Sequence, residues 1–218
     1  MYNQLNLFSP NHKSLERTTN GKNLIREPIL MDNADVIIYR HLFYKEESDQ
    51  LFDELYNNTN WRQDSISFYG KSIPLPRLTA WYGNSGKSYT YSGIEMEPEH
   101  WTPNLLKIKS KIEILADVEF NSVLLNLYRS GKDSVSWHSD DEAELGKNPV
   151  IASVSFGDTR RFMFREKNQK DARKIEIELD HGSFLIMRGE TQHFWQHQVP
   201  KTSKPVNPRI NLTFRVII

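Results

Sequence analysis

The second half of the chain, from residue 123 onward, is a series of short strand-like runs separated by turn residues. The runs are rich in branched and aromatic side chains, and Gly131, Gly157 and Gly189 interrupt them. Many short strands with regular turns predict a β-sandwich or barrel. The predicted strands cover residues 123–128, 134–137, 151–156, 161–165, 174–179, 183–187, 193–197 and 209–217.

The first half of the chain predicts fewer elements. A strand-like run begins near Asp35, and apolar residues at helical spacing predict helices over residues 45–57 and after Pro103. Residues 1–30 are polar and predict a flexible tail. A chain of 218 residues suits one domain, so residues 31–218 are expected to fold as a single unit.

The charges of the chain balance, since it has 28 basic and 28 acidic residues. A dominant positive field is therefore excluded, and any contact with nucleic acid must come from a local patch. The absence of cysteine excludes disulfides, iron–sulfur clusters, thiolate zinc sites and cysteine nucleophiles. We expect a cytoplasmic protein without membrane contact, because the sequence shows neither a secretory signal nor a membrane-length apolar run.

A first chemical signal is His138-Ser139-Asp140. Residues i and i+2 of a strand project from the same face, so the imidazole and the carboxylate can converge on one point, although a solvated turn gives the same pattern. With a second histidine they would form the two-histidine, one-carboxylate triad of non-haem Fe(II) oxygenases. The candidates are His181, which lies in a turn-like segment, and His193 and His197, which share one face of a predicted strand. Periodicity does not choose between the last two.

The C-terminal strand supplies a second signal, because its polar residues alternate with apolar ones. An arginine that points into a barrel is costly unless it meets an anion, and a guanidinium binds a carboxylate with two hydrogen bonds. The pattern indicates a small acidic ligand, or else a half-exposed strand with an ordinary polar face. Asn126 and Tyr128 share a strand face and can complete such a pocket or face solvent. The polar residues of the C-terminal strand are Arg209, Asn211, Thr213 and Arg215.

Taken together, these segments resemble the AlkB family of Fe(II)- and 2-oxoglutarate-dependent dioxygenases, most closely the branch that repairs alkylated double-stranded DNA. The resemblance covers roughly residues 60–218. It implies a mainly β fold with some α: a double-stranded β-helix (jelly-roll) core over about residues 120–218, N-terminal helices, and a nucleotide-recognition lid over about residues 60–100. The segments that carry it are residues 125–128, 137–142, 151–157, His197 and 209–215.

The resemblance assigns His138, Asp140 and His197 as iron ligands, since the family's third ligand lies shortly before the first C-terminal arginine and His197 precedes Arg209 by twelve residues. His193 then has a supporting or structural role. Arg209 would bind the distal carboxylate of 2-oxoglutarate. The other residues expected around this cosubstrate are Tyr128 beside Arg209, Asn126 and Arg215 near its chelating end, and Thr213 on the pocket wall.

The implied activity is oxidative demethylation of 1-methyladenine and 3-methylcytosine in DNA, with Fe(II) as cofactor and 2-oxoglutarate and O2 as cosubstrates. Hydroxylation of the N-methyl group releases formaldehyde, while 2-oxoglutarate becomes succinate and CO2. Two alternatives stay open. One is an RNA demethylase or hydroxylase with the same iron site, and the other is a non-catalytic jelly-roll module that binds nucleic acid.

A base inside a duplex must be flipped out before it can reach such a centre. The resemblance places Tyr89 and Tyr91 along the base pocket, with the ring of His138 as the other wall and Glu142 near the exocyclic amine. Ordinary aromatic packing is the alternative for the two tyrosines. Each of these residues is expected to contact the flipped base or its edge.

Phe68-Tyr69-Gly70 reads as the tip of a hairpin and matches the intercalating finger of the duplex-specific homologues. An aromatic wedge of this kind fills the stack that a flipped base leaves. Arg77 is expected to hold a DNA phosphate nearby. Lys201 and Lys204 make a thinner basic cluster than the family has in that loop, which puts tight duplex binding in doubt.

Within the polar N-terminus, Gln4-Leu5-Asn6-Leu7-Phe8 resembles the peptide that binds the bacterial sliding clamp. Two apolar anchors on a flexible tail can dock in a groove and fold on binding, although an inert tail has the same composition. Gln4, Leu5, Leu7 and Phe8 are the expected contacts. The peptide would imply a bacterial source. We also expect a monomer that associates with the nucleoid through its DNA substrate.

Overall fold

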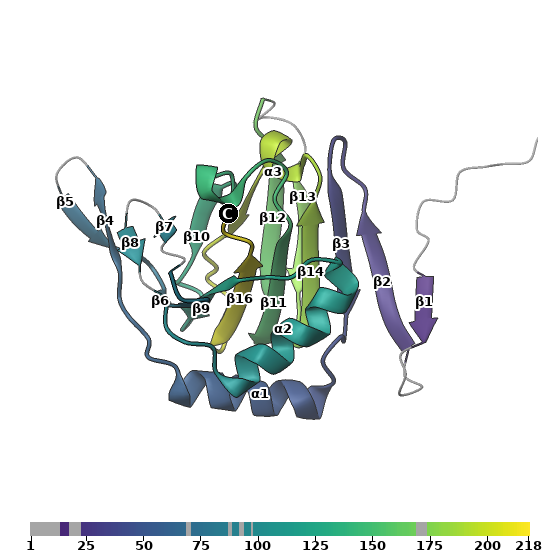
Figure 1. Cartoon of the computed structure of the whole chain (residues 1–218), viewed down its shortest axis with the longest axis horizontal. Helices are drawn as coiled ribbons and strands as arrows, with labels where there is room; N and C mark the ends of the chain where they lie inside the picture. The colour runs from purple at the N-terminus through teal and green to yellow at the C-terminus, as the bar shows by residue number, and fades with distance from the viewer. Residues whose placement is uncertain are drawn as a thin grey trace, which may run out of the picture.

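Two antiparallel sheets carry most of the described chain and enclose the space between them (Figure 1). The computed structural model describes residues 14–17, 23–68, 71–86, 89–91, 94–96, 98–168 and 174–218. The large sheet has the order β1-β2-β3-β14-β11-β16-β9-β6, and the small one β10-β15-β12-β13. This arrangement confirms the predicted mainly β, jelly-roll class.

The strands have the following bounds. The large sheet contains β1 Ser14–Arg17, β2 Asn23–Ile29, β3 Asp35–Arg40, β14 Ser183–Arg188, β11 Ile151–Gly157, β16 Arg209–Arg215, β9 Ser122–Tyr128 and β6 Leu78–Gly83. The small sheet contains β10 Val135–His138, β15 Trp195–Val199, β12 Arg160–Glu166 and β13 Ile175–Leu179. Two separate hairpins pair β4 Ser65–Phe68 with β5 Lys71–Pro74, and β7 Tyr89–Tyr91 with β8 Ile94–Met96.

Two helices, α1 Lys45–Asn58 and α2 Pro103–Ala116, cover the outer face of the large sheet (Figure 1). The sequence predicted both. Helix α2 begins as the sequence indicates, with Pro103 in its first turn and the Thr102 hydroxyl accepting a hydrogen bond from the Leu105 N–H. Its buried stripe packs with α1 and the sheet in one apolar cluster. Among the described residues, no helix is long and apolar enough to span a membrane.

Strand β16 shows how the sequence separates two cores. Ile210, Leu212 and Phe214 belong to the cluster under the helices. The alternate residues of the strand, from Arg209 to Arg215, line a pocket on the other face. A second apolar cluster, which includes Phe162 and Phe164 of β12, fills the space between the two sheets around that pocket. The alternation of side chains along one strand therefore gives it an apolar face and a polar, site-lining face.

The tail predicted for residues 1–30 is wrong for the segments that form β1 and β2. Strand β2 pairs with β3 in the register Ile25↔Arg40 to Ile29↔Val36 and continues the large sheet. This pairing satisfies backbone groups at the edge of β3, and Leu24 of β2 is buried. A polar composition reveals neither feature. Residues 1–13, including the clamp-like peptide, lie outside the described residues.

A second correction concerns the predicted strand over residues 193–197. Residues Thr191–Phe194 form the short helix α3, and the strand β15 begins only at Trp195. The other short helical element is η1 Ala143–Leu145. His193 and His197 therefore do not share a strand face. His193 is exposed on α3, and its Nε2 lies 2.7 Å from Oδ1 of Asn148.

Candidate metal centre

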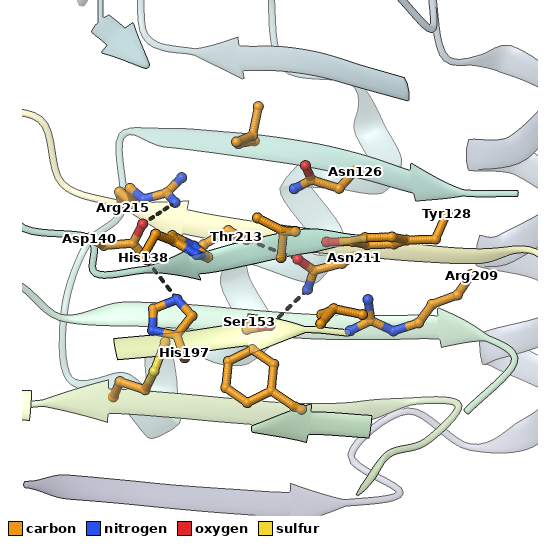
Figure 2. A pocket seen from close by; sticks show the side chains of 15 residues that line it. Asn126, Tyr128, His138, Asp140, Ser153, His197, Arg209, Asn211, Thr213 and Arg215 are labelled. Carbon is orange, nitrogen blue, oxygen red and sulfur yellow. Dashed lines mark hydrogen bonds and ion pairs between the residues drawn. The ribbon is translucent and has the colours of Figure 1, made fainter. Parts of the chain in front are cut away.

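Three of the predicted residues meet at one point between the sheets: His138, Asp140 and His197 (Figure 2). One ligand atom from each lies within 4.8 Å of the others. His138 ends β10 and stands directly opposite His197 of β15, and the two ring centroids are 4.3 Å apart. Asp140 follows two residues after the strand, with Oδ2 3.8 Å from Nε2 of His197. Pairing of β10 with β15 thus assembles the group from distant parts of the chain.

The surroundings orient these side chains. Nδ1 of His138 lies 2.8 Å from the Ser136 carbonyl oxygen, so Nδ1 carries the proton and donates it, which leaves Nε2 available to a metal. The Asp140 N–H donates to Oε1 of Gln192 at 3.0 Å. Nη2 of Arg215 donates to Oδ1 of Asp140 at 2.7 Å. Both residues of that ion pair are buried, at 1% and 2% exposure.

The electrostatics favour the ligand form of all three groups. Burial alone would raise the pKa of Asp140, but Arg215 and the two imidazoles outweigh it and lower the pKa to about 2. Burial lowers the pKa of His197 to about 3, aided by the nearby His138, and burial also lowers the pKa of His138. At neutral pH the site therefore presents one carboxylate and two neutral imidazoles. Metal ligands must be in these protonation states, so a divalent cation fits the site.

The pocket beside this group is formed by both sheets (Figure 2). The three candidate ligands lie on the small-sheet side, on β15 and on β10 and the residues just after it. The polar residues that extend the pocket away from them come from β9, β11 and β16 of the large sheet. The lining residues are Leu124, Asn126, Tyr128, Val135, His138, Asp140, Ser153, Phe162, Met187, His197, Val199, Arg209, Asn211, Thr213 and Arg215.

Arg209, at the far end of β16 from Arg215, is a candidate anion site. It is 1% exposed, its Nη2 donates to Oγ of Ser155 at 2.9 Å, and the ring of Tyr128 lies 5.2 Å from the guanidinium carbon. Burial lowers the pKa of Arg209 to about 10, so it keeps its charge at neutral pH. Its Nε and Nη1 are buried without a hydrogen-bond partner among the described residues. Buried donors in this state need an acceptor, and a carboxylate supplies two oxygens.

The other predicted cosubstrate residues also line the pocket. Oδ1 of Asn126 accepts a hydrogen bond from Nε of Arg77 at 2.7 Å, so its amide N–H groups are the ones that can donate to a ligand. The Thr213 hydroxyl donates to Oδ1 of Asn211 at 3.1 Å. Asn211 in turn donates to Oγ of Ser153 at 2.7 Å, so this wall is a connected polar network.

Sequence reasoning assigned no role to several residues that build the site. Asn211 and Ser153 line the pocket, Ser155 holds Arg209, and Gln192 holds the backbone of Asp140. The alternation along β16 already put Asn211 on the pocket face, and the same period on β11 could have found the two serines. Nothing local marks Gln192, because its partner is 52 residues away in the sequence.

The phosphate contact predicted for Arg77 is not possible in this conformation. Arg77 is only 3% exposed, and it binds Asn126 beneath the pocket instead of facing solvent. A charged side chain in the sequence suggests a surface position, but a buried amide partner on the adjacent strand β9 keeps this one inside. Figure 2 shows the Asn126 that accepts its hydrogen bond.

The structure describes only some of the residues that are predicted to contact a base. Glu142 is half-buried two residues after Asp140. The backbones of Tyr89 and Tyr91 form β7, and Phe68 ends β4. Tyr69 and Gly70 lie outside the described residues. Strands β4 and β5 pair as an antiparallel hairpin in which Phe68 lies opposite Lys71.

The sequence profile of the 2OG-Fe(II) oxygenase superfamily matches residues 35–215 of this chain, a span that contains the triad and both arginines. The chain belongs to this superfamily. Members of this 2OG-Fe(II) oxygenase superfamily use Fe(II), 2-oxoglutarate and O2, and His138, Asp140 and His197 match the donor set that such an iron requires.

Within the superfamily, this chain is an AlkB homologue. It is 48% identical over 180 residues to the alpha-ketoglutarate-dependent dioxygenase alkB homolog 3 of Bos taurus, covering 79% of this chain and 62% of the relative. The Homo sapiens alkB homolog 3 is 45% identical over 190 residues, with 84% and 66% covered. The DNA oxidative demethylase ALKBH2 of Homo sapiens is 38% identical over 189 residues, with 83% and 72% covered. The predicted AlkB resemblance is confirmed.

The matched region does not extend over the whole length of these relatives. It spans 62–66% of the alkB homolog 3 proteins from four mammals. A solved structure titled "The structure of OsALKBH1" superposes with a TM-score of 0.61 at 19% identity, covering 86% of this chain and 98% of its own. At that identity the superposition supports the fold alone.

Proposed function

We propose that this protein oxidatively demethylates N-alkylated DNA bases, namely 1-methyladenine and 3-methylcytosine, in the repair of alkylation damage. The observation that carries the proposal is one pocket with two complementary ends. One end holds the His138–Asp140–His197 group, and the other holds a buried Arg209 whose Nε and Nη1 lack a hydrogen-bond partner among the described residues. A dicarboxylate that chelates a metal at one end and meets a guanidinium at the other fits these needs.

The overall reaction balances as N-methyl base, 2-oxoglutarate and O2 giving base, formaldehyde, succinate and CO2. When bound, Fe(II) supplies the activation of O2 and the oxidation of the 2-oxo acid. The chain's own residues would bind and orient the cosubstrate and the metal ligands. Arg209 would fix the distal carboxylate, and Arg215 holds Asp140 through its hydrogen bond to Oδ1. No side chain need act as a nucleophile.

Thr213 and Asn126 would contact the chelating half of 2-oxoglutarate from the large sheet. Both are nearly buried, at 8% and 5% exposure, so water has little access to this end of the pocket. Exclusion of water strengthens each polar contact with the ligand and protects a reactive site from side reactions. The walls around them include Leu124 and Val135, which are apolar.

The substrate side would be formed by the lid. His138 is partly exposed, so its ring can face an incoming base. Tyr89 and Tyr91 would stack on a flipped base, and Glu142 would accept from its exocyclic amine. Flipping a methylated base costs less free energy than flipping a normal base, because its pairing is already weakened. The alkylated adenine or cytosine would thus enter between β7 and the metal end of the pocket.

Formaldehyde release from a duplex oligonucleotide with one 1-methyladenine tests the proposal. The protein is supplied with Fe(II), ascorbate and 2-oxoglutarate. Wild-type protein should release formaldehyde only when 2-oxoglutarate is present. His197→Ala should abolish release, whereas His193→Ala, a matched change of an exposed histidine four residues away, should retain it. Circular dichroism checks that both variants are folded.

Matched single-stranded DNA and RNA oligonucleotides separate the alternatives. Faster release from RNA than from DNA would replace the proposal with an RNA demethylase that uses the same iron site. Succinate without formaldehyde would leave an oxygenase with another substrate. If iron-loaded protein forms no succinate with any oligonucleotide, the non-catalytic binding module would replace the proposal.

The β4–β5 hairpin is proposed as the finger that enters the duplex. It stands away from the large and the small sheet in Figure 1, and β5 is exposed along its length. Phe68 at the end of β4 lies opposite Lys71 at the start of β5. Tyr69→Ala should slow demethylation of duplex DNA more than that of single strands, since only a duplex has a stack to fill. Equal loss on both substrates would contradict the assignment.

The N-terminal peptide is proposed as a contact for a sliding clamp, through Gln4, Leu5, Leu7 and Phe8. The support is the spacing of polar and apolar residues alone. Removing residues 1–9 should leave demethylation unchanged and abolish binding to a bacterial clamp in fluorescence polarisation. The most similar relatives given above come from mammals, so the bacterial source, nucleoid association and monomeric state remain predictions.

A further inference from the structure

Arg160, at the start of β12, is a buried charge to which the proposed function assigns no role. It is 3% exposed, although its neighbour Arg161 is exposed and pairs with Glu176 on the outer face of the small sheet. Burying a guanidinium is costly unless its donors are satisfied. The cost implies that the surroundings of Arg160 are specifically arranged.

Three backbone carbonyls from two loops satisfy this guanidinium. Nη1 donates to the carbonyl of Ser130 at 3.2 Å, and Nη2 donates to those of Asp133 at 2.9 Å and Pro200 at 2.7 Å. The first two carbonyls lie between β9 and β10, and the third follows β15. These loops join strands that carry Tyr128, His138 and His197. The fork of Arg160 is therefore fixed by backbone rather than by flexible side chains.

The same guanidinium packs on Tyr128. Its central carbon lies 5.7 Å from the centre of the Tyr128 ring, and that of Arg209 lies 5.2 Å from the same ring. Tyr128 and Arg209 are also direct partners in the pairing of β9 with β16. One aromatic ring is thus shared by a guanidinium that backbone atoms hold and a guanidinium that has donors available to a ligand.

We infer that Arg160 is a positioning residue for the distal carboxylate of the cosubstrate, acting on Arg209 through the ring of Tyr128. The chain of contacts runs from backbone carbonyls to Arg160, from Arg160 to Tyr128, and from Tyr128 to Arg209. Lysine keeps the charge at position 160 but cannot make the planar fork that reaches three carbonyls and covers the ring. The inference rests on the proposed function, because it assumes that 2-oxoglutarate is the ligand.

The test compares two ligands that differ only in the distal carboxylate, 2-oxoglutarate and 2-oxovalerate. Isothermal titration calorimetry on Mn(II)-loaded protein without oxygen turnover measures both affinities. Arg160→Lys should lower the affinity for 2-oxoglutarate about tenfold, which is the size expected for the loss of a cation–π contact that also orients Arg209. The affinity for 2-oxovalerate should change less than about twofold. Arg161→Lys, the exposed neighbour, should change neither affinity. Arg160→Gln, a second variant, should reproduce the loss of selectivity.

A double-mutant cycle distinguishes positioning from a general structural role. In a Tyr128→Leu background, Arg160→Lys should change 2-oxoglutarate affinity by less than about twofold, because the route to Arg209 is already cut. A loss of equal size with and without Tyr128 would overturn the inference, and so would unchanged selectivity in both Arg160 variants or the failure of both to fold. Wild-type protein that does not prefer 2-oxoglutarate to 2-oxovalerate would overturn the proposed cosubstrate as well.

Discussion

Replacing Asp140 by asparagine should destabilise the metal-free protein strongly, although Asp140 is a candidate metal ligand and not part of the apolar core. The change keeps the shape of the side chain and removes its charge. In the fold, that charge lies 2.7 Å from Nη2 of Arg215, with the two side chains 1% and 3% exposed. The ion pair also joins the residues after β10 to β16, one on each side of the pocket.

The expected magnitude rests on two observations. The pKa of Asp140 falls from 3.8 to about 2 in spite of its burial. That difference corresponds to about 2 kcal/mol in favour of the charged form. Removing one partner of a buried pair costs about 3–5 kcal/mol, because the remaining charge stays buried. We therefore expect Asp140→Asn to lower the free energy of unfolding by about 2–5 kcal/mol.

Urea unfolding at pH 7 in the presence of EDTA measures this difference without a contribution from metal. Asp141→Asn is the matched control, since Asp141 is the next residue, pairs with Lys167 at 2.7 Å, and is 49% exposed. An exposed ion pair contributes about 0–1 kcal/mol. If both variants lose the same free energy within about 0.5 kcal/mol, the argument from burial is refuted.

Three further predictions concern the frame of the site. Ile112→Ala on α2 should cost about 2–5 kcal/mol in urea unfolding, because Ile112 is 0% exposed, whereas Ile114→Ala on the same helix should cost under about 1 kcal/mol since Ile114 is 82% exposed. Gly182→Ala should lower the melting temperature more than Gly86→Ala: both glycines have a positive φ, of 76° and 77°, but only at Gly182 would a Cβ collide with the Phe43 carbonyl, so equal losses would contradict a steric cause. The Arg129 hydrogen bonds lower the pKa of Asp133 although burial opposes them, so this carboxylate should stabilise the fold above its ordinary pKa of about 3.9 and lose that contribution as the pH falls through the lowered pKa. The free-energy gap between wild type and Asp133→Asn should therefore be constant from pH 7 to 5 and close in stronger acid, and a gap that grows in acid would contradict the assignment.

The periodic spacing of polar and apolar residues accounts for most of the elements that the sequence predicts correctly. The period of two along β16 is enough to separate the pocket face from the core face, and helical spacing placed α1 and α2 within a few residues of their bounds. These signals are local, because the side chains that report burial are close in sequence. A strand buried on both faces still shows which side is polar.

The predictions that were wrong depend on distant partners. Aromatic residues made residues 193–197 resemble a strand, but tertiary contacts close the turn of α3: the Asp35 N–H donates to the Thr191 hydroxyl, and Gln192 holds Asp140. Strand β2 forms because β3 offers an edge. Arg77 is buried because Asn126, 49 residues later, accepts its hydrogen bond. None of these partners can be identified from the local sequence.

The division of the pocket between two sheets has a mechanical consequence. The candidate metal ligands belong to the small-sheet side, whereas Arg209, Thr213 and Asn126 belong to the large sheet. A cosubstrate that reaches from the metal to Arg209 is then a removable cross-link between two layers. The binding energy of this ligand opposes separation of the two sheets, so the sheets should move apart less often when the ligand is bound. Under the proposed function, the two sheets would separate less easily once 2-oxoglutarate is bound and more easily after succinate leaves.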